Sequence, residues 1–275
     1  MELISIILPY YKKKTFINKT IKSILSQSYK KFELIIIYDD NDKNDLFYIK
    51  KLIKNNSRIK LIINKRNIGA AKSRNIGVSK SNGEYICFID SDDLWKKNKL
   101  KNQLSFMKKN QCYLSHTHYK IINNFEKTTG FMKIKKILKY KDLINSCDIG
   151  LSTVMINAKL KSQIIFPNIK TKEDFVLWLK LSRNYNFLGI QKYLVSWRQG
   201  TPSLRYIWQK FKDAFIVYSK YEKFNIFKSY LFVIILSFNF IKKSLLQNSE
   251  RDVAIFWIFR WSECCWQFKP IWSVY

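Results

Sequence analysis

The chain has 275 residues, of which 47% are hydrophobic and 16% aromatic, a composition that excludes global disorder and permits one large α/β domain or a medium domain with an appendage. Fifty Lys plus Arg against twenty Asp plus Glu leave a formal net charge of +30, which favours anionic partners such as nucleic acid, anionic lipid or phosphorylated small molecules, although scattered Lys also results from codon bias in an AT-rich genome. The five cysteines lack C-x-x-C spacing and no signal peptide precedes the first expected strand, so the sequence argues against a zinc site and predicts a reduced, cytoplasmic environment.

The first 95 residues alternate apolar runs with helical periodicity. Strands are expected at 3–8, 32–37, 59–63 and from 84 to the carboxylates at 90, with helices over 17–25, 46–53 and 70–81 between them. Because strands that alternate with helices form βαβ units, the pattern predicts a parallel sheet with right-handed crossovers.

Polar residues follow three of these strands. Pro9 and Tyr11 follow the first strand, Asp39-Asp40 the second, and Asp90-Ser91-Asp92-Asp93 the fourth. The carboxyl ends of parallel strands meet at one edge of a sheet, where ligands of open α/β folds bind. The three loops therefore predict a ligand site at that edge.

The carboxylates after the fourth strand carry the most specific signal. Asp90 and Asp92 alternate on a turn and can share Mg²⁺ or Mn²⁺, whose remaining ligands are usually phosphates and water. The alternative interpretation is that Asp92 only caps a helix that starts near Leu94-Trp95.

Beyond residue 95 the pattern changes. It predicts a basic helix over 94–110, short strands within 113–122 and 153–156, and an apolar helix over 175–181, so this half is expected to be α+β. Glu173 and Asp174 precede the last of these helices, whose dipole favours the ionised form of Asp174. The alternative interpretation is that Glu173 or Asp174 only caps the helix.

Five segments together resemble one known family: residues 6–11 (Ile-Ile-Leu-Pro-Tyr-Tyr), 23–29 (Ser-Ile-Leu-Ser-Gln-Ser-Tyr), 32–40 (Phe-Glu-Leu-Ile-Ile-Ile-Tyr-Asp-Asp), 67–75 (Asn-Ile-Gly-Ala-Ala-Lys-Ser-Arg-Asn) and 83–93 (Gly-Glu-Tyr-Ile-Cys-Phe-Ile-Asp-Ser-Asp-Asp). This order of motifs is similar to that of the family 2 glycosyltransferases with a GT-A fold. The resemblance is close over residues 3–95, and residues 171–180 resemble the family's second acidic motif. It implies a Rossmann-like α/β fold with a mostly parallel central sheet flanked by helices.

The resemblance also implies an inverting transfer from a nucleotide-sugar donor, with UDP expected, and a divalent cation, Mn²⁺ or Mg²⁺. Carried over by position, Pro9 and Tyr11 line the nucleoside pocket, Asp39 accepts a hydrogen bond from the uracil, Arg74 lies near the base, and Asp90 lies near the ribose. Asp92 holds the metal. Because Asp39-Asp40-Asn41-Asp42 stands where the family has Asp-Asp-Gly-Ser, Asp40 is a second candidate for the nucleoside contact.

Two further roles follow from the resemblance. Asp174 matches the general base that takes the proton of the acceptor hydroxyl. This role requires that Asp174 and the leaving group lie on opposite faces of the transferred sugar. Arg198 lies in a segment that resembles a late family loop, and its guanidinium is expected to close over the diphosphate. We therefore expect residues 1–205 to form the catalytic domain, with a nucleotide-binding half (1–95) and an acceptor-binding half (96–205).

Residues 206–275 are expected to form a basic, aromatic helical extension. They combine Lys and Arg with Trp257, Trp261, Trp266 and Trp272, as helices in a membrane interface do, so the sequence predicts either peripheral attachment to an anionic membrane surface or packing on the catalytic domain. The longest apolar run, 229–241, is too short to span a bilayer. A glycosyltransferase that is attached to the membrane in this peripheral way would act at the inner face of the plasma membrane.

The resemblance predicts a glycan or lipid-linked acceptor and a role in bacterial surface polysaccharide or lipopolysaccharide synthesis. A nucleic-acid-binding protein and a nucleotidyltransferase that makes nucleotide sugars are the alternatives. No nucleic-acid-binding motif accompanies the charge, carboxylates repel phosphates without a cation, and a Gly-rich phosphate loop is lacking, so neither alternative is favoured and no nucleic-acid partner is expected.

Overall fold

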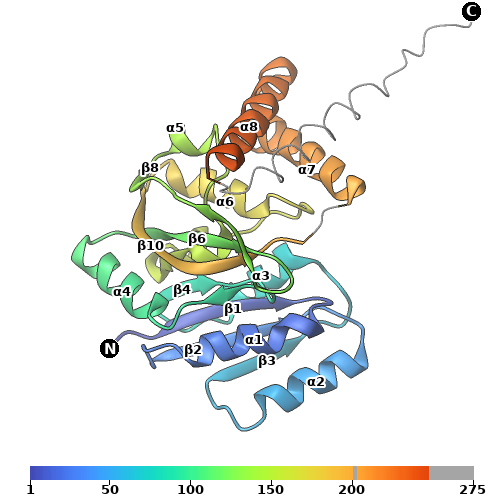
Figure 1. Cartoon of the computed structure of the whole chain (residues 1–275), viewed down its shortest axis with the longest axis vertical. Coiled ribbons are helices and arrows are strands. Elements are labelled where there is room, and N and C mark those ends of the chain that lie inside the picture. Colours follow the sequence, from blue (N-terminus) through green and yellow to red (C-terminus); the bar gives the residue numbers. More distant parts are fainter. Residues whose placement is uncertain (201–202, 248–275) are drawn as a thin grey trace, which may run out of the picture.

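The computed structural model describes residues 1–200 and 203–247 (Figure 1). Its first part alternates strands and helices in the predicted order: β1 (Ile4–Tyr10), α1 (Lys14–Leu25), β2 (Phe32–Tyr38), α2 (Lys43–Ile53), β3 (Ile59–Ile63), α3 (Ala70–Ser79) and β4 (Tyr85–Phe88). Within this part, β3, β2, β1 and β4 lie side by side in that order and run parallel. The prediction of a parallel sheet is confirmed for this part of the chain.

The second part is more irregular. Its elements are β5 (Leu94–Trp95), α4 (Lys99–Lys109), β6 (Leu114–Ile122), β7 (Thr128–Met132), β8 (Ile137–Leu138), α5 (Tyr140–Leu143), η1 (Leu151–Thr153), β9 (Met155–Asn157), η2 (Ala158–Gln163), α6 (Glu173–Ser182), β10 (Phe187–Arg198), α7 (Leu204–Ile216), η3 (Val217–Tyr221) and α8 (Ile226–Gln247). The sheet continues from β4 through β9, β6, β10 and β5. Pairing is mixed there, because β9 is antiparallel to both β4 and β6, whereas β10 is parallel to β6.

The predicted helix over 94–110 is wrong in its first turn. Leu94 and Trp95 form β5, which pairs with β10, and the indole N–H of Trp95 donates to the carbonyl of Ser152 at 2.9 Å. These tertiary hydrogen bonds hold the segment extended, and α4 begins only at Lys99. Because the N-cap of α4 is Asn98, Asp92 does not cap it.

Helix α3 lies close against the sheet. A Cβ atom at Gly77 would overlap the side chains of Ile7 and Ile37, so glycine is what allows this approach. Close packing of α3 on β1 and β2 fixes Arg74, one turn earlier on the same helix, beside the carboxyl end of β4.

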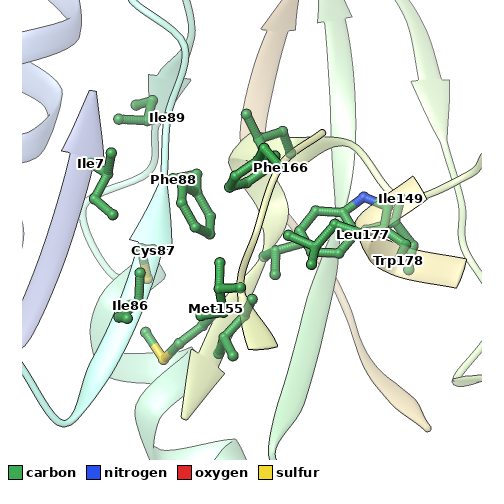
Figure 2. Close-up of a cluster of buried hydrophobic side chains, with 14 of the residues drawn as sticks. Ile7, Ile86, Cys87, Phe88, Ile89, Ile149, Met155, Phe166, Leu177 and Trp178 are labelled. Carbon is green, nitrogen blue, oxygen red and sulfur yellow. The ribbon is translucent and has the colours of Figure 1, made fainter. Parts of the chain in front are cut away.

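The buried core joins the two parts. Figure 2 shows Phe88 of β4 facing Phe166, with Leu177 and Trp178 of α6 on the other side of the cluster. The Phe88 and Phe166 rings meet edge to face with centroids 5.2 Å apart, and Phe88, Leu177 and Trp178 are completely buried. This packing sets the N-terminus of α6 against the polar edge of the sheet.

The described part of the C-terminal extension packs on the residues that precede it (Figure 1). Asp213 of α7 is buried and accepts hydrogen bonds from the amide and hydroxyl of Thr171, both at 2.8 Å. The hydroxyl of Tyr218 donates to the carbonyl of Ile144 at 2.9 Å. Residues 206–247 therefore pack against residues 1–200 as part of the same fold.

No helix within the described residues is both long and apolar enough to cross a bilayer. Helix α8 contains the apolar run 229–241 that the sequence analysis singled out. Trp257, Trp261, Trp266 and Trp272, on which the membrane prediction rests in part, lie outside the described residues.

Candidate active site

The loops after β1, β2 and β4 meet at one edge of the sheet. The loop after β1 connects the other two: the backbone N–H of Lys12 donates to Asp40 at 2.9 Å, and the ammonium of Lys13 pairs with Asp92 at 2.7 Å. The convergence predicted from the sequence is therefore present, with the acidic residues of both strands reached from a single loop.

Asp39 is almost completely buried and holds the loop before α3. Its two carboxylate oxygens accept the backbone N–H groups of Ile68 and Gly69, each at 2.8 Å, and the amide of Asn64 at 2.8 Å. The amide of Asn67 also donates to its side chain and its carbonyl. Since these donors take up most of its accepting capacity, Asp39 fixes this loop in place.

Asp40 is differently engaged. It accepts only two backbone N–H groups, those of Lys12 and of its neighbour Asn41, one on each oxygen. Each oxygen of Asp40 thus keeps a lone pair without a partner among the described residues. Nearby, Pro9 is buried within β1, whereas Tyr11 is 46% exposed and the ammonium of Lys12 lies 5.2 Å from the centroid of its ring.

Asp93 anchors the acidic turn after β4. It is buried, and its oxygens accept the hydroxyl of Ser152 at 2.5 Å and the backbone N–H of Arg198 at 2.9 Å. The same hydroxyl of Ser152 accepts the backbone N–H of Asp90 at 3.1 Å. Burial, together with the charges of Asp90 and Asp92, raises the pKa of Asp93 well above its ordinary value.

Arg198 lies beneath the turn. Its guanidinium donates to the carbonyls of Asp92 at 2.9 Å and Asn123 at 2.7 Å, and it stacks 4.4 Å from the centroid of the Phe16 ring. The residue is buried. In this conformation it shapes the turn that carries Asp92, and its predicted contact with a diphosphate would require these hydrogen bonds to break.

Asp92 has one side-chain partner among the described residues, the ammonium of Lys13, and the Lys13 side chain is 43% exposed. Asp90 likewise pairs with one residue, but the guanidinium of that residue, Arg74, is buried. Burial and then the charge of Asp90 raise the pKa of Asp92, an effect that Lys13 partly opposes. A carboxylate that is desolvated beside another carboxylate is stabilised by any cation that binds there.

Arg74 joins the acidic turn to the second acidic motif. Its guanidinium donates to Asp90 at 2.8 Å and to Glu173 at 2.5 Å, and it is buried against the Phe166 ring. Burial lowers the pKa of Arg74, but the charges of Asp90 and Glu173 outweigh it and leave the pKa above its ordinary value. Arg74 therefore stays charged and holds the two acidic segments together.

Asp174 follows Glu173 at the start of α6 and is partly buried. Burial and then the charge of Glu173 raise the pKa of Asp174 to about 6, against the opposing effects of Arg74, Lys172 and the Phe175 N–H, which donates to it at 2.8 Å. The N-cap position of α6 is Lys172, so neither acidic residue caps the helix. A carboxylate with this pKa is ionised at neutral pH and still basic enough to accept a proton.

Sequence reasoning named Glu173 only as the neighbour of Asp174 and missed Lys13, Ser152 and Tyr206. Ser152 and Glu173 organise the acidic residues. Burial and then the charges of Glu173, Asp90, Asp174 and Asp92 raise the pKa of Tyr206 on α7. The only local signal was the acidic pair at 173–174, because the partners of Ser152 and Tyr206 come from distant parts of the chain.

Comparisons with known proteins identify the family of the chain. Residues 5–161 match the model of the family described as Glycosyl transferase family 2. The chain is 32% identical over 246 residues to the putative teichuronic acid biosynthesis glycosyltransferase TuaG of Bacillus subtilis, an alignment that covers 88% of this chain and 98% of that protein.

A second relative is an Escherichia coli protein, WfgD, described as a UDP-Glc:alpha-D-GlcNAc-diphosphoundecaprenol beta-1,3-glucosyltransferase. It is 39% identical over 188 residues, which are 68% of this chain and 73% of that protein. Among solved structures, residues 1–349 of S. aureus TarS in complex with UDP superpose with a TM-score of 0.62 at 22% identity, over 78% of this chain and 64% of that one.

The family assignment favours the transferase over the nucleic-acid-binding and nucleotidyltransferase interpretations. One fold accounts for five motifs in order and for a sheet whose carboxyl edge gathers Asp40, Asp90 and Asp92. It also accounts for a second acidic motif, which Arg74 joins to that edge. The chain belongs to glycosyl transferase family 2 and is an inverting, nucleotide-sugar-dependent glycosyltransferase with a GT-A fold.

Proposed function

We propose that this enzyme transfers a sugar from a UDP-linked donor to a hydroxyl of a lipid-linked acceptor during assembly of a bacterial surface polysaccharide, with a divalent cation held at Asp92 and with Asp174 as the general base. The observation that carries the proposal is the Arg74 bridge, which sets Asp174 beside the acidic turn at the carboxyl end of β4. The relatives named for teichuronic acid synthesis and for a diphosphoundecaprenol acceptor support the pathway and the acceptor class.

On the nucleoside side, the hydrogen bonding favours Asp40 over Asp39 as the residue that accepts from uracil. Asp39 is occupied by the loop at 67–69, whereas Asp40 keeps accepting capacity on both oxygens. Tyr11 is exposed next to it and offers a ring on which a base can stack. The complex of TarS with UDP supports a uridine nucleotide as the donor's carrier.

The residues present fit a divalent cation. Asp92 and Asp90 offer hard carboxylate oxygens, and Lys13, the only partner of Asp92 among the described residues, is flexible enough to move away. The described residues contain no group of three or more His, Cys, Asp or Glu side chains that could hold a metal, so a cation here would need phosphate oxygens and water as its other ligands. A bound cation would neutralise the charge that develops on the diphosphate as it leaves. A mannosyltransferase from Pyrobaculum calidifontis solved with GDP-Man and Mn²⁺ has the same fold at a TM-score of 0.60 and supports this choice.

The chain's own residues supply the acid–base chemistry. With a pKa near 6, Asp174 is ionised at neutral pH and takes the proton of the acceptor hydroxyl as the new bond forms. Glu173 does not compete for this role because Arg74 engages it. Inversion requires that Asp174 and the leaving diphosphate lie on opposite faces of the transferred sugar.

A membrane-bound acceptor requires that the enzyme reach the bilayer. Helix α8 exposes large apolar side chains on its outer face, among them Phe227, Leu231, Ile234 and Phe238, each more than half exposed. The exposed lysines at 228 and 242 and the formal net charge of +30 favour an anionic surface, whereas Lys243 is ion-paired with Asp148. We therefore assign this face of α8 to peripheral binding of anionic lipid at the cytoplasmic side.

The membrane assignment is tested with liposomes. The double variant Leu231→Glu/Phe238→Glu should lose co-sedimentation with anionic liposomes while a folded catalytic domain remains. Phe125→Glu, at a residue that is 92% exposed in a different loop, is the matched control and should bind like the wild type. Equal binding by the double variant and the control would remove α8 from the interface.

The catalytic assignment is tested by titrating UDP into the full chain with and without Mn²⁺. Binding should depend on the metal, and Asp92→Ala should lose at least about tenfold of that affinity, since a charged ligand to the cation is removed. Asp142→Ala, a surface carboxylate paired with Lys135, is the control. Metal-independent binding of equal strength in Asp92→Ala and the wild type would refute the role of Asp92, and a panel of UDP-sugars assayed for donor hydrolysis then identifies the sugar.

A further inference from the structure

Two lysines beside the base remain unused by the chemistry above. Lys172 precedes α6 directly, in a left-handed backbone conformation (φ 65°), and Lys210 lies on α7, one turn after Tyr206. Neither has an ion-pair or hydrogen-bond partner for its ammonium group among the described residues, whereas Lys13 and Arg74 in the same site are both paired. The two ammonium groups lie only over aromatic rings, of Phe175 and Tyr206 respectively.

The fold holds these lysines together. Buried Asp213 accepts the amide and hydroxyl of Thr171, the residue before Lys172, and also the side-chain amide of Gln209, the residue before Lys210, at 3.0 Å. One carboxylate thus contacts the residue before each lysine, Thr171 through its backbone and side chain and Gln209 through its side chain. Burial and then the charge of Lys172 lower the pKa of Lys210 to about 8, and the charge of Asp174 partly opposes this.

The lysines lie near Asp174. Lys172 is two residues before Asp174, and its ammonium lies 5.9 Å from the ring centroid of Phe175, the residue after Asp174. The charges of Lys172 and Asp174 both act on Lys210. Asp90 and Glu173 are instead paired with Arg74, so the site contains two places for an anion: the acidic turn, which needs a cation, and the lysines, which do not.

We propose that Lys172 and Lys210 bind the diphosphate of the acceptor and thereby hold its sugar hydroxyl at Asp174. The inference rests on the proposed function, because it assigns the acceptor's anionic group to a subsite of the same active site. Two unpaired ammonium groups match the charge of a diphosphate, and lysine is a common phosphate ligand. The donor's own diphosphate is the other source of this chemistry.

The test titrates geranyl diphosphate into the full chain without any divalent metal, a condition in which the donor carboxylates repel a diphosphate. The alcohol geraniol is titrated in parallel to subtract binding of the apolar chain. Lys172→Met and Lys210→Met should each weaken diphosphate binding by at least about fivefold, the effect expected for loss of one charge-assisted contact. Lys210→Arg should retain binding, and Lys212→Met, an exposed lysine on the same helix, should bind like the wild type.

The same variants are titrated with UDP and Mn²⁺, and their thermal midpoints show that they fold. Unchanged UDP affinity together with weakened geranyl diphosphate binding supports the acceptor subsite. Weakened UDP binding would assign the lysines to the donor, and unchanged geranyl diphosphate binding would remove them from anion binding; either result overturns the inference. If the wild type fails to bind UDP with Mn²⁺, the proposed function fails, while the metal-free titration still decides the role of the lysines.

Discussion

Replacing Asp174 by Asn should abolish turnover and at the same time stabilise the fold at neutral pH. The pKa of Asp174 is raised from 3.8 to about 6 in the folded protein, so the folded state binds this proton more tightly than the unfolded state does. The resulting stability is fully present below pH 3.8 and is lost as the pH rises through 6. At about 1.4 kcal/mol per tenfold change in proton affinity, the ionised carboxylate destabilises the fold by about 3 kcal/mol at pH 7.

Asn cannot ionise, and it keeps the oxygen that accepts the N–H of Phe175. The free energy of unfolding of Asp174→Asn, measured by urea denaturation relative to the wild type, should therefore rise by about 2 kcal/mol between pH 4.5 and pH 7. Transfer should fall by at least about 100-fold with donor binding retained, because a base is lost and no donor contact is. A stability difference that does not change with pH would refute the raised pKa, and retained turnover would place the base elsewhere.

The other predictions concern the residues that position the site. Arg74→Met should lower the free energy of unfolding by about 3 kcal/mol or more, because Asp90 and Glu173 lose the cation between them, and should slow transfer; a urea midpoint equal to that of the wild type would contradict the bridge. Asp39→Ala should lower stability by at least about 2 kcal/mol, since two backbone N–H groups and the amide of Asn64 lose their acceptor. Asp40→Ala also removes the acceptor of two backbone N–H groups, but these belong to the exposed residues Lys12 and Asn41 and can turn to water, so it should lower stability by less and weaken UDP binding by about tenfold in calorimetry. If Asp39 rather than Asp40 contacts uracil, Asp39→Ala would weaken UDP binding and Asp40→Ala would not.

The first half of the fold was predictable because its signals are local. Strands buried on both faces are near-continuous apolar runs, and the helices between them bury residues such as Ile17, Ile21 and Ile24 at helical spacing. The motifs at Asp39-Asp40 and Asp90–Asp93 lie at the ends of such strands, so the edge at which they meet follows from the parallel order alone.

The second half was less predictable because its structure depends on pairings between distant segments. Strand β5 has two residues and exists through its pairing with β10, about 100 positions later, so its sequence also suits the helix that was expected there. The bridge from Arg74 to Glu173 joins residues 99 positions apart. Hydrophobic periodicity also does not predict that Asp213 anchors α7. The role of this buried Asp follows only from its contact with Thr171, which is 42 positions earlier in the chain.

The central claim is that the acidic turn after β4 binds a cation and the donor's diphosphate, with Asp174 on the opposite side of the sugar position. A crystal structure of the full chain with UDP and Mn²⁺, in which anomalous scattering locates the manganese, tests it most directly. We expect a manganese peak bonded to the carboxylate of Asp92 and to the phosphates of UDP, with uracil between Tyr11 and Asp40. Manganese away from Asp92, or UDP bound outside the edge formed by β1, β2 and β4, would contradict it.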